Sequence, residues 1–332
     1  MDRRRLVNFG PDAYINTNCK PDGPRESGAR FISDKLNQGT GADVQTKREE
    51  SLSIRSIRRF APLLASTLQR DRTSYTADVD GDGKARAVIA SYNIHKGVGR
   101  DRRFDPRRTA QVIREIQPDV IALQEADRRF GDRAGILDID SLTRECGLVP
   151  VPLKFSPGGH GWHGNVILYR EGSVTATRQV KLAGLEPRGA LVVDLDLPTG
   201  PLRIVAAHLG LLRRSRVLQI SALLSVARSR DNRPVLLMGD FNEWRLGDRS
   251  TLHGLAPEFG PLHDPIASFP ARFPVLALDR ILAYPQSLIS SVTLHDTALA
   301  RVASDHLPLK AVVNLSARGT GSAAKACERA AA

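Results

Sequence analysis

The chain has 332 residues, of which 41% are hydrophobic, and this is enough for one large core or two smaller ones. Its formal net charge of +12 predicts attraction to polyanions such as nucleic acid, anionic lipid or phosphorylated small molecules. Its three cysteines lie far apart and no stretch is long and apolar enough to cross a bilayer, which excludes a disulfide framework, a zinc knuckle and a transmembrane protein.

Residues 1–84 are rich in glycine and charge and show no sustained hydrophobic period, so we expect a mostly disordered extension. Within it, residues 53–70 combine Arg58 and Arg59 with a short apolar run and predict one amphipathic helix, which could make peripheral contact with an anionic membrane. A twin-arginine export signal is the alternative interpretation, although no cleavage site follows. The cysteine usage favours a reducing compartment, and we expect a cytoplasmic monomer.

From residue 85 the hydrophobic pattern becomes regular. Apolar and β-branched runs predict strands, and apolar residues at helical spacing predict helices. The predicted strands cover residues 85–94, 119–127, 164–170, 189–197, 202–210, 234–240, 278–284 and 308–315, and the predicted helices cover 105–118 and 213–230. Strands outnumber helices and some follow one another directly, which favours a layered mixed α/β domain over residues 85–316. Residues 317–332 are expected to form a disordered tail.

Polar side chains stand at the ends of the predicted strands, in a pattern that repeats along the chain. They are Asn93, Glu125, His208, Asp240 with Asn242, Asp279, and Asp305 with His306. One such carboxylate is usually a turn former or a helix cap. Strands that end at one edge of a packed sandwich would instead bring all of these groups together.

The residue types suit phosphodiester hydrolysis. Mg²⁺ and Mn²⁺ prefer carboxylate and amide oxygens, which Asn93, Glu125 and Asp305 could supply. Hydrolysis also needs an oriented water and relief of phosphoryl charge, for which an Asp–His pair and a second aspartate are suitable. The chain contains neither a phosphate-cradling P-loop nor a G-x-S-x-G elbow, which excludes nucleotide-driven phosphoryl transfer and serine-esterase chemistry.

Six motifs carry a resemblance to a known superfamily. They are SYNIHKG, IALQEAD, VAAHLG, LLMGDFNEW, LDRILAY and ASDHLPL, in this order between about residues 85 and 315. The set resembles the endonuclease/exonuclease/phosphatase superfamily, the metal-dependent phosphoesterases related to deoxyribonuclease I. The resemblance implies a four-layer α/β sandwich, with two packed mixed β-sheets flanked by helices and the site at one end of the sheets.

The resemblance also implies roles for individual residues. Asn93, Glu125 and Asp305 would belong to the Mg²⁺ or Mn²⁺ site, with Glu125 the principal ligand. Asp240 would orient or deprotonate the attacking water, Asn242 would hold water and phosphate, and His208 would face the scissile phosphate. Asp279 would fix the tautomer of His306. Arg188 is a candidate for contacting the phosphate, and Asn165 for supporting substrate binding by hydrogen bonds.

The motifs define the reaction but leave the substrate open. We expect an endonuclease-like hydrolase acting on nucleic acid, because of the net charge and the similarity to deoxyribonucleases. A phospholipid or small-molecule phosphodiesterase is the alternative, favoured by the low aromatic content of 5% and the basic segment at 53–70. An inactive binding protein is a third interpretation. The cluster Arg213, Arg214 and Arg216 could contact flanking phosphates or form a solvated helix face.

Overall fold

The computed structural model describes residues 75–76, 86–128, 133–155, 159–227, 233–245, 247–262 and 264–315. The predicted helix at 53–70 and the predicted tail at 317–332 lie outside these residues. So does the rest of the predicted extension, apart from Tyr75–Thr76, which form a short strand. Within the described part, no helix has the length and apolar character needed to cross a membrane.

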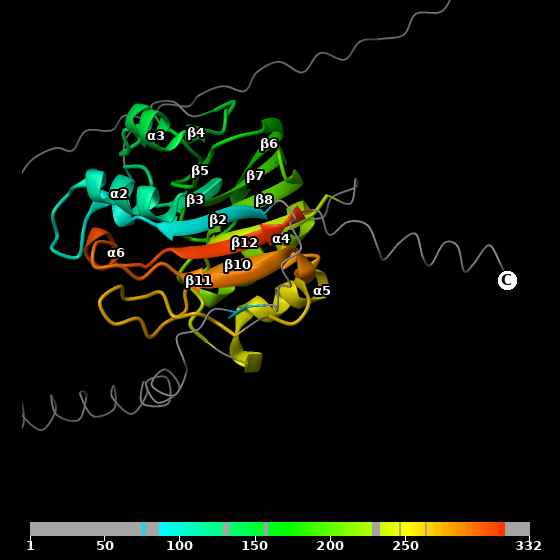
Figure 1. Ribbon diagram of the computed structural model, residues 1–332. Helices are drawn as coiled ribbons and strands as arrows, with labels where there is room; N and C mark the ends of the chain where they lie inside the picture. The colour runs from blue at the N-terminus through cyan, green and yellow to red at the C-terminus, as the bar shows by residue number, and fades with distance from the viewer. Residues whose placement is uncertain are drawn as a thin grey trace, which may run out of the picture. The chain divides into compact units, whose positions relative to one another are not determined.

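The strands form two sheets (Figure 1). The seven-stranded sheet has the order β1, β11, β12, β2, β3, β5, β4, and the five-stranded sheet has the order β10, β9, β8, β7, β6. The strands of the first sheet are β1 Tyr75–Thr76, β2 Arg86–Asn93, β3 Val120–Gln124, β4 Val149–Pro150, β5 Val166–Tyr169, β11 Ile289–Leu294 and β12 Leu309–Asn314. Those of the second are β6 Ser173–Leu182, β7 Arg188–Leu197, β8 Gly200–His208, β9 Val235–Asp240 and β10 Asp279–Tyr284.

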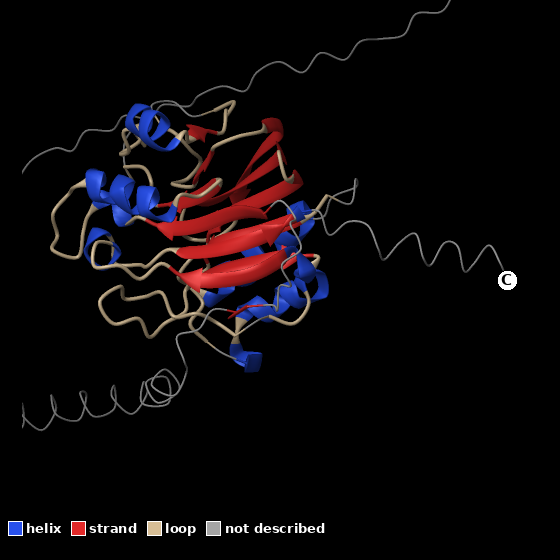
Figure 2. Cartoon of the chain, viewed as in Figure 1, coloured by secondary structure: helices blue, strands red, loops and turns tan. Residues whose placement is uncertain are grey.

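Helices flank the strands on the outside (Figure 2). The α-helices are α2 Pro106–Ile116, α3 Ile139–Cys146, α4 Arg213–Ala227, α5 Ala256–Phe259 and α6 Ala300–Ala303, and the 3₁₀ turns are η1 His95–Gly97, η2 Gly247–Arg249, η3 Thr251–Leu255 and η4 Gln286–Leu288. Helix α2 begins where the Asp105 side chain accepts a hydrogen bond from the backbone N–H of Arg107, with Pro106 at its first position. It ends at Gln117, which adopts a left-handed conformation before Pro118.

Three apolar cores lie between these layers. The first joins the two sheets and contains alternate residues of β2, β8, β9 and β10, such as Ile89, Ile204, Met238 and Ile281. The second packs α2, α3 and α6 on the seven-stranded sheet, and the third packs α4, η3 and α5 on the five-stranded sheet. Helix, sheet, sheet and helix therefore follow one another, and the predicted four-layer α/β sandwich is confirmed.

Every strand and helix predicted for residues 85–316 overlaps an observed one, but the pattern missed several elements. The largest are β6 and β11, together with helix α3. Strand β6 is an edge strand in which Leu182 alone is buried, and Arg178 interrupts its apolar alternation, so the pattern that would reveal it is weak. Strand β11 is short and contains Ser290 and Ser291.

Candidate active site

The strand ends that the sequence singles out meet between the two sheets. Alternation along each strand places Asn93, His208, Asp240 and Asp279 on the same face as the residues of the inter-sheet core. Strand β8 is parallel to β9, and β10 is antiparallel to it, so His208 and Asp279 both stand beside Asp240 in register. All four side chains are buried.

Asp240 lies at the centre of this group. Its Oδ2 accepts a 2.9 Å hydrogen bond from Asn93 Nδ2, which comes from the opposite sheet. The same oxygen lies 3.4 Å from His208 Nε2 and 3.7 Å from His306 Nε2. Its Oδ1 accepts a 2.9 Å hydrogen bond from the backbone N–H of Asn242. Residues from four separate motifs therefore converge on one carboxylate.

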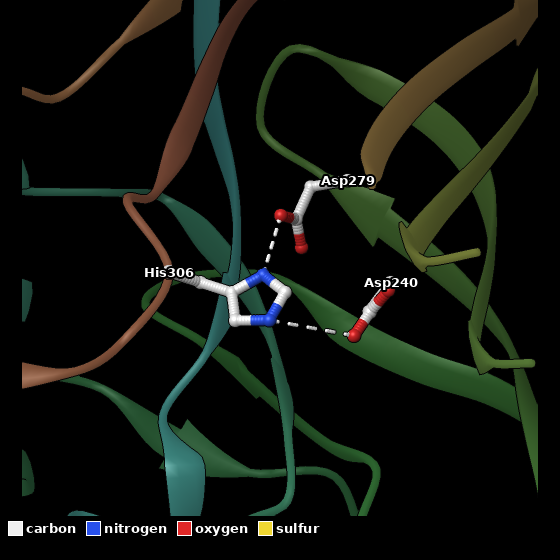
Figure 3. A group of neighbouring side chains, drawn as sticks. All are labelled: Asp240, Asp279 and His306. Atoms are coloured by element: carbon white, nitrogen blue, oxygen red, sulfur yellow. Dashed lines mark hydrogen bonds and ion pairs between the residues drawn. The ribbon is translucent and has the colours of Figure 1, made fainter. Parts of the chain in front are cut away.

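His306 bridges two carboxylates (Figure 3). Its Nδ1 lies 2.8 Å from Asp279 Oδ2, so the hydrogen bond expected between these residues is present. Asp279 Oδ2 also accepts a 2.5 Å hydrogen bond from the Ser268 hydroxyl. Burial lowers the pKa of His306, but the negative charges of Asp279 and Asp240 outweigh burial and raise this pKa to about 10. At neutral pH His306 is therefore an imidazolium.

Asp240, Asp279 and His306 have the composition of a metal site, since their ligand atoms all lie within 4.8 Å of one another. This group could hold a metal ion. Without one, the His306 imidazolium already supplies a positive charge between the two carboxylates, and a protonated nitrogen cannot act as a ligand. A metal bound here would have to displace that proton, which makes this group a poorer fit than an oxygen-only site.

Arg188 contacts His208 from the outer side. Its guanidinium, which can only donate, lies 3.0 Å from His208 Nδ1. The other ring nitrogen, Nε2, faces Asp240 Oδ2 at 3.4 Å. Glu186 Oε2 in turn binds the Arg188 guanidinium at 2.8 Å and 3.1 Å.

The GDFN turn holds Asn242 beside these groups. Asn242 has a φ of 50°, and its Nδ2 donates to the carbonyl of Leu209 and lies 3.1 Å from His208 Nε2. Gly239 has a φ of 140°, and a Cβ there would lie 1.8 Å from the Ala207 carbonyl oxygen. Only glycine therefore allows β9 to approach β8 this closely.

Glu125 lies at a separate edge of the site, directly after β3. Its Oε2 is buried and receives no hydrogen bond of good geometry, but the Lys96 ammonium lies only 2.7 Å away. The backbone N–H of Lys96 also donates to the Glu125 carbonyl. Hard divalent cations prefer carboxylate oxygens, and Glu125 Oε2 is a buried carboxylate oxygen that already lies beside the positive charge of Lys96. Glu125 therefore fits the role of metal ligand that the resemblance implies. Lys96 was not among the predicted site residues.

Asp305 and Asn165 lie at the periphery. Asp305 Oδ1 is 3.8 Å from His95 Nδ1, a histidine to which the sequence assigned no task. Asn165 is buried, and its Nδ2 donates to the carbonyls of Trp162 and Gly189, next to Arg188. These contacts brace the β5 and β7 ends, and Asn165 is not among the residues lining the pocket described below. The metal-binding roles of Asn93, Glu125 and Asp305, and the substrate-binding role of Asn165, stay predictions.

A solvent-open pocket of roughly 370 Å³ joins Glu125 to His208. It is lined by Lys96, Glu125, Asp127, Arg133, His163, Gly164, Pro187, Arg188 and His208. Four of these residues, Lys96, Glu125, Arg133 and His163, adopt left-handed backbone conformations, with φ between 49° and 57°. Non-glycine residues in this region cost energy and concentrate at functional sites. The only signal for Lys96 in the sequence was its place in the motif SYNIHKG, three residues after Asn93.

The predicted cluster Arg213, Arg214 and Arg216 does not exist as a unit. Arg213 and Arg214 are exposed, but Arg216 is 1% exposed and pairs with the fully buried Glu243 at 3.2 Å. Glu243 also accepts hydrogen bonds from the N–H and hydroxyl of Thr251. Arg216 therefore anchors the segment after the GDFN turn rather than contacting phosphates or forming part of a solvated face.

Comparisons with known proteins agree with this geometry. Residues 90–306 match the model of the Endonuclease/Exonuclease/phosphatase family. The uncharacterized protein YbhP of Escherichia coli (strain K12) is 31% identical over 252 residues, covering 68% of this chain and 96% of YbhP. A solved structure of an endonuclease/exonuclease/phosphatase from Beutenbergia cavernae is 22% identical with a TM-score of 0.53, covering 71% of this chain and 73% of that one. D. rerio TDP2 complexed with a single strand DNA product is 15% identical with a TM-score of 0.51, covering 70% of this chain and all of that one.

Proposed function

The chain belongs to the endonuclease/exonuclease/phosphatase family, and from this premise we propose that it is a divalent-metal-dependent phosphoesterase that hydrolyses phosphodiester bonds. The observation that carries the proposal is the convergence of Asn93, His208, His306 and Asn242 on the Asp240 carboxylate, from both sheets. A strand-end aspartate that only caps a turn would not gather two histidines around it.

Asp240 is the group suited to orient the attacking water and to accept its proton. Asn93 and Asn242 fix the carboxylate in place by donating to its two oxygens. The imidazolium of His306 places positive charge beside it, and a ring nitrogen of His208 lies 3.4 Å away, so both histidines stand where negative charge develops on the phosphoryl oxygens. Arg188 lines the pocket next to His208 and adds a further cation.

Glu125, with Asn93 and Asp305, would hold the divalent cation. When bound, Mg²⁺ or Mn²⁺ would neutralise phosphoryl charge and stabilise the leaving oxygen. The buried Glu125 Oε2, whose neighbour is the Lys96 ammonium, supports a cation at this edge of the site.

The substrate class has to come from this chain's own residues, because neighbours below 25% identity share the fold alone. Nucleic acid is the first candidate, supported by the net charge of +12. Phospholipid is the second, and exposed leucines beside the site favour it. The cytoplasmic location expected from the cysteine usage stays a prediction.

Hydrolysis of bis-p-nitrophenyl phosphate tests the reaction. We expect Asp240→Asn and His306→Ala to lose roughly 10²–10⁴-fold in turnover, since proton handling contributes about this much. Asp248→Asn and His253→Ala, two exposed sites, are the matched controls and should retain activity. Turnover should need Mg²⁺ or Mn²⁺ and vanish with EDTA. Activity of the wild-type level in Asp240→Asn would refute the proposal, and a panel of DNA, RNA and phospholipids then compares the substrate classes.

A further inference from the structure

Large apolar side chains are exposed on the loops that flank His208 and Arg188. Leu185 is 85% exposed, Leu211 65% and Leu212 49%. Leu211 and Leu212 are adjacent in the chain, and Leu185 precedes Glu186, whose side chain binds the Leu211 backbone. Exposed apolar side chains that gather in this way mark interaction sites.

These loops contact each other and border the pocket. The backbone N–H of Leu211 donates a 2.8 Å hydrogen bond to Glu186 Oε1, so the loop after β8 touches the loop before β7. Pro187 is exposed and lines the pocket, as does Arg188. The apolar surface therefore runs from Leu211 to the entrance of the candidate active site.

Helix α4 extends this surface. Arg214, Val217, Leu218 and Ser221 are exposed along one side of the helix, at the spacing of a single face. Val217 is 47% exposed and Leu218 58%, while Ile220 and Leu223 of the same helix are buried in the third core. Helix α4 thus carries apolar residues on two sides, and only one of these sides is covered within the described part of the chain. We call Leu185, Leu211, Leu212, Val217 and Leu218 the leucine rim.

The charge around the leucine rim is positive. Arg213 and Arg214 are exposed beside Leu212, and residues 209–221 contain no acid. Glu186 is the single acid of residues 181–188, and it is paired with Arg188. Apolar side chains flanked by arginines that have no acidic partner among the described residues match the interface of an anionic bilayer, where apolar groups insert and cations meet lipid phosphates.

We propose that the leucine rim docks the protein on an anionic phospholipid membrane and presents a lipid phosphodiester to the pocket. This rests on the proposed function and assigns its substrate to the phospholipids. Nucleic acid fits the rim poorly, because bases stack on aromatic side chains and the rim has none. A second copy also fits poorly, because a two-fold contact of the rim with itself would bring Arg213 and Arg214 against their own counterparts.

Sedimentation of the full chain with phosphatidylcholine vesicles, with and without phosphatidylglycerol, tests docking without requiring catalysis. The double variant Leu211→Ser/Leu212→Ser should bind anionic vesicles at least about tenfold more weakly than wild type. Arg213→Gln/Arg214→Gln should lose roughly fivefold per charge, on anionic vesicles only. Tyr284→Ser is the matched control, since Tyr284 is 48% exposed at the end of β10 opposite Asp279.

Hydrolysis separates docking from chemistry. The double leucine variant should retain wild-type turnover of bis-p-nitrophenyl phosphate while hydrolysis of vesicle phospholipid falls in parallel with binding. Vesicle binding that persists in a protein with no hydrolytic activity would refute the proposed function and leave docking standing. Equal vesicle binding by wild type and the double variant would overturn the inference. So would weakened DNA binding in the leucine variant, or a change from dimer to monomer in sedimentation velocity.

Discussion

The pair of Asp279 and His306 gives a stability prediction whose size depends on pH. Asp279→Asn removes the carboxylate that most strongly raises the pKa of His306, which otherwise rises from 6.5 to about 10 against the opposing effect of burial. In wild type the folded state holds the proton more tightly than the unfolded state. The pair's contribution is therefore fully present below about pH 6.5 and is lost as pH rises toward 10.

The magnitude follows from the same contact. A pKa rise from 6.5 to about 10 sets an upper bound of roughly 5 kcal/mol, and breaking a buried charged pair usually costs about 3–5 kcal/mol. We therefore expect Asp279→Asn to lose about 3–5 kcal/mol in the free energy of unfolding near pH 6, and much less near pH 10.

Urea unfolding in EDTA, followed by tryptophan fluorescence, measures this difference at both pH values. The exposed Asp248→Asn is the control and should match wild type throughout. If the loss in free energy of unfolding caused by Asp279→Asn stays constant across this pH range, the carboxylate acts through packing or hydrogen bonding alone. That result would refute the charge argument.

Three further predictions follow from buried contacts. Lys96→Met should bind Mn²⁺ roughly fivefold more tightly in a paramagnetic resonance titration, because the ammonium 2.7 Å from Glu125 competes with the metal; weaker binding would contradict this. Glu243→Gln leaves the buried Arg216 charge unpaired and should cost about 3–5 kcal/mol in urea unfolding, so a loss below about 1 kcal/mol would be evidence against the pair. Gly239→Ala should push β9 from β8 and cost at least about 1–3 kcal/mol as well as activity, and a fully active variant would disprove the steric argument.

The sequence predicted that these strand-end side chains meet because each polar residue keeps the phase of its own strand. Asn93 follows Ile89 by an even number of positions, Asp240 follows Met238, and Asp279 precedes Ile281 in the same way. The apolar pattern that identifies the strand thus also gives the direction of the terminal side chain. What this pattern cannot give is the pairing of strands, and so the register that sets His208 and Asp279 on either side of Asp240 was seen only in the structure.

One misjudged residue, Arg216, and one overlooked residue, Lys96, show where the pattern was ambiguous. Arg216 stands in the basic run of residues 213–216 and was grouped with its solvated neighbours. Its helical phase, four residues before Ile220 and seven before Leu223, would have placed it on the buried face. Lys96 gave no such signal, because its contact with Glu125 depends on a left-handed backbone in a 3₁₀ turn that no periodicity describes.

Glu186 connects the leucine rim to Arg188 in the candidate active site. One carboxylate oxygen accepts from the backbone of Leu211 in the leucine rim, and the other holds the Arg188 guanidinium. Arg188 in turn contacts His208 Nδ1 at 3.0 Å. The Leu211 backbone and the Arg188 guanidinium are therefore held by the same carboxylate. Three contacts, Leu211–Glu186, Glu186–Arg188 and Arg188–His208, connect the proposed docking surface to the candidate active site.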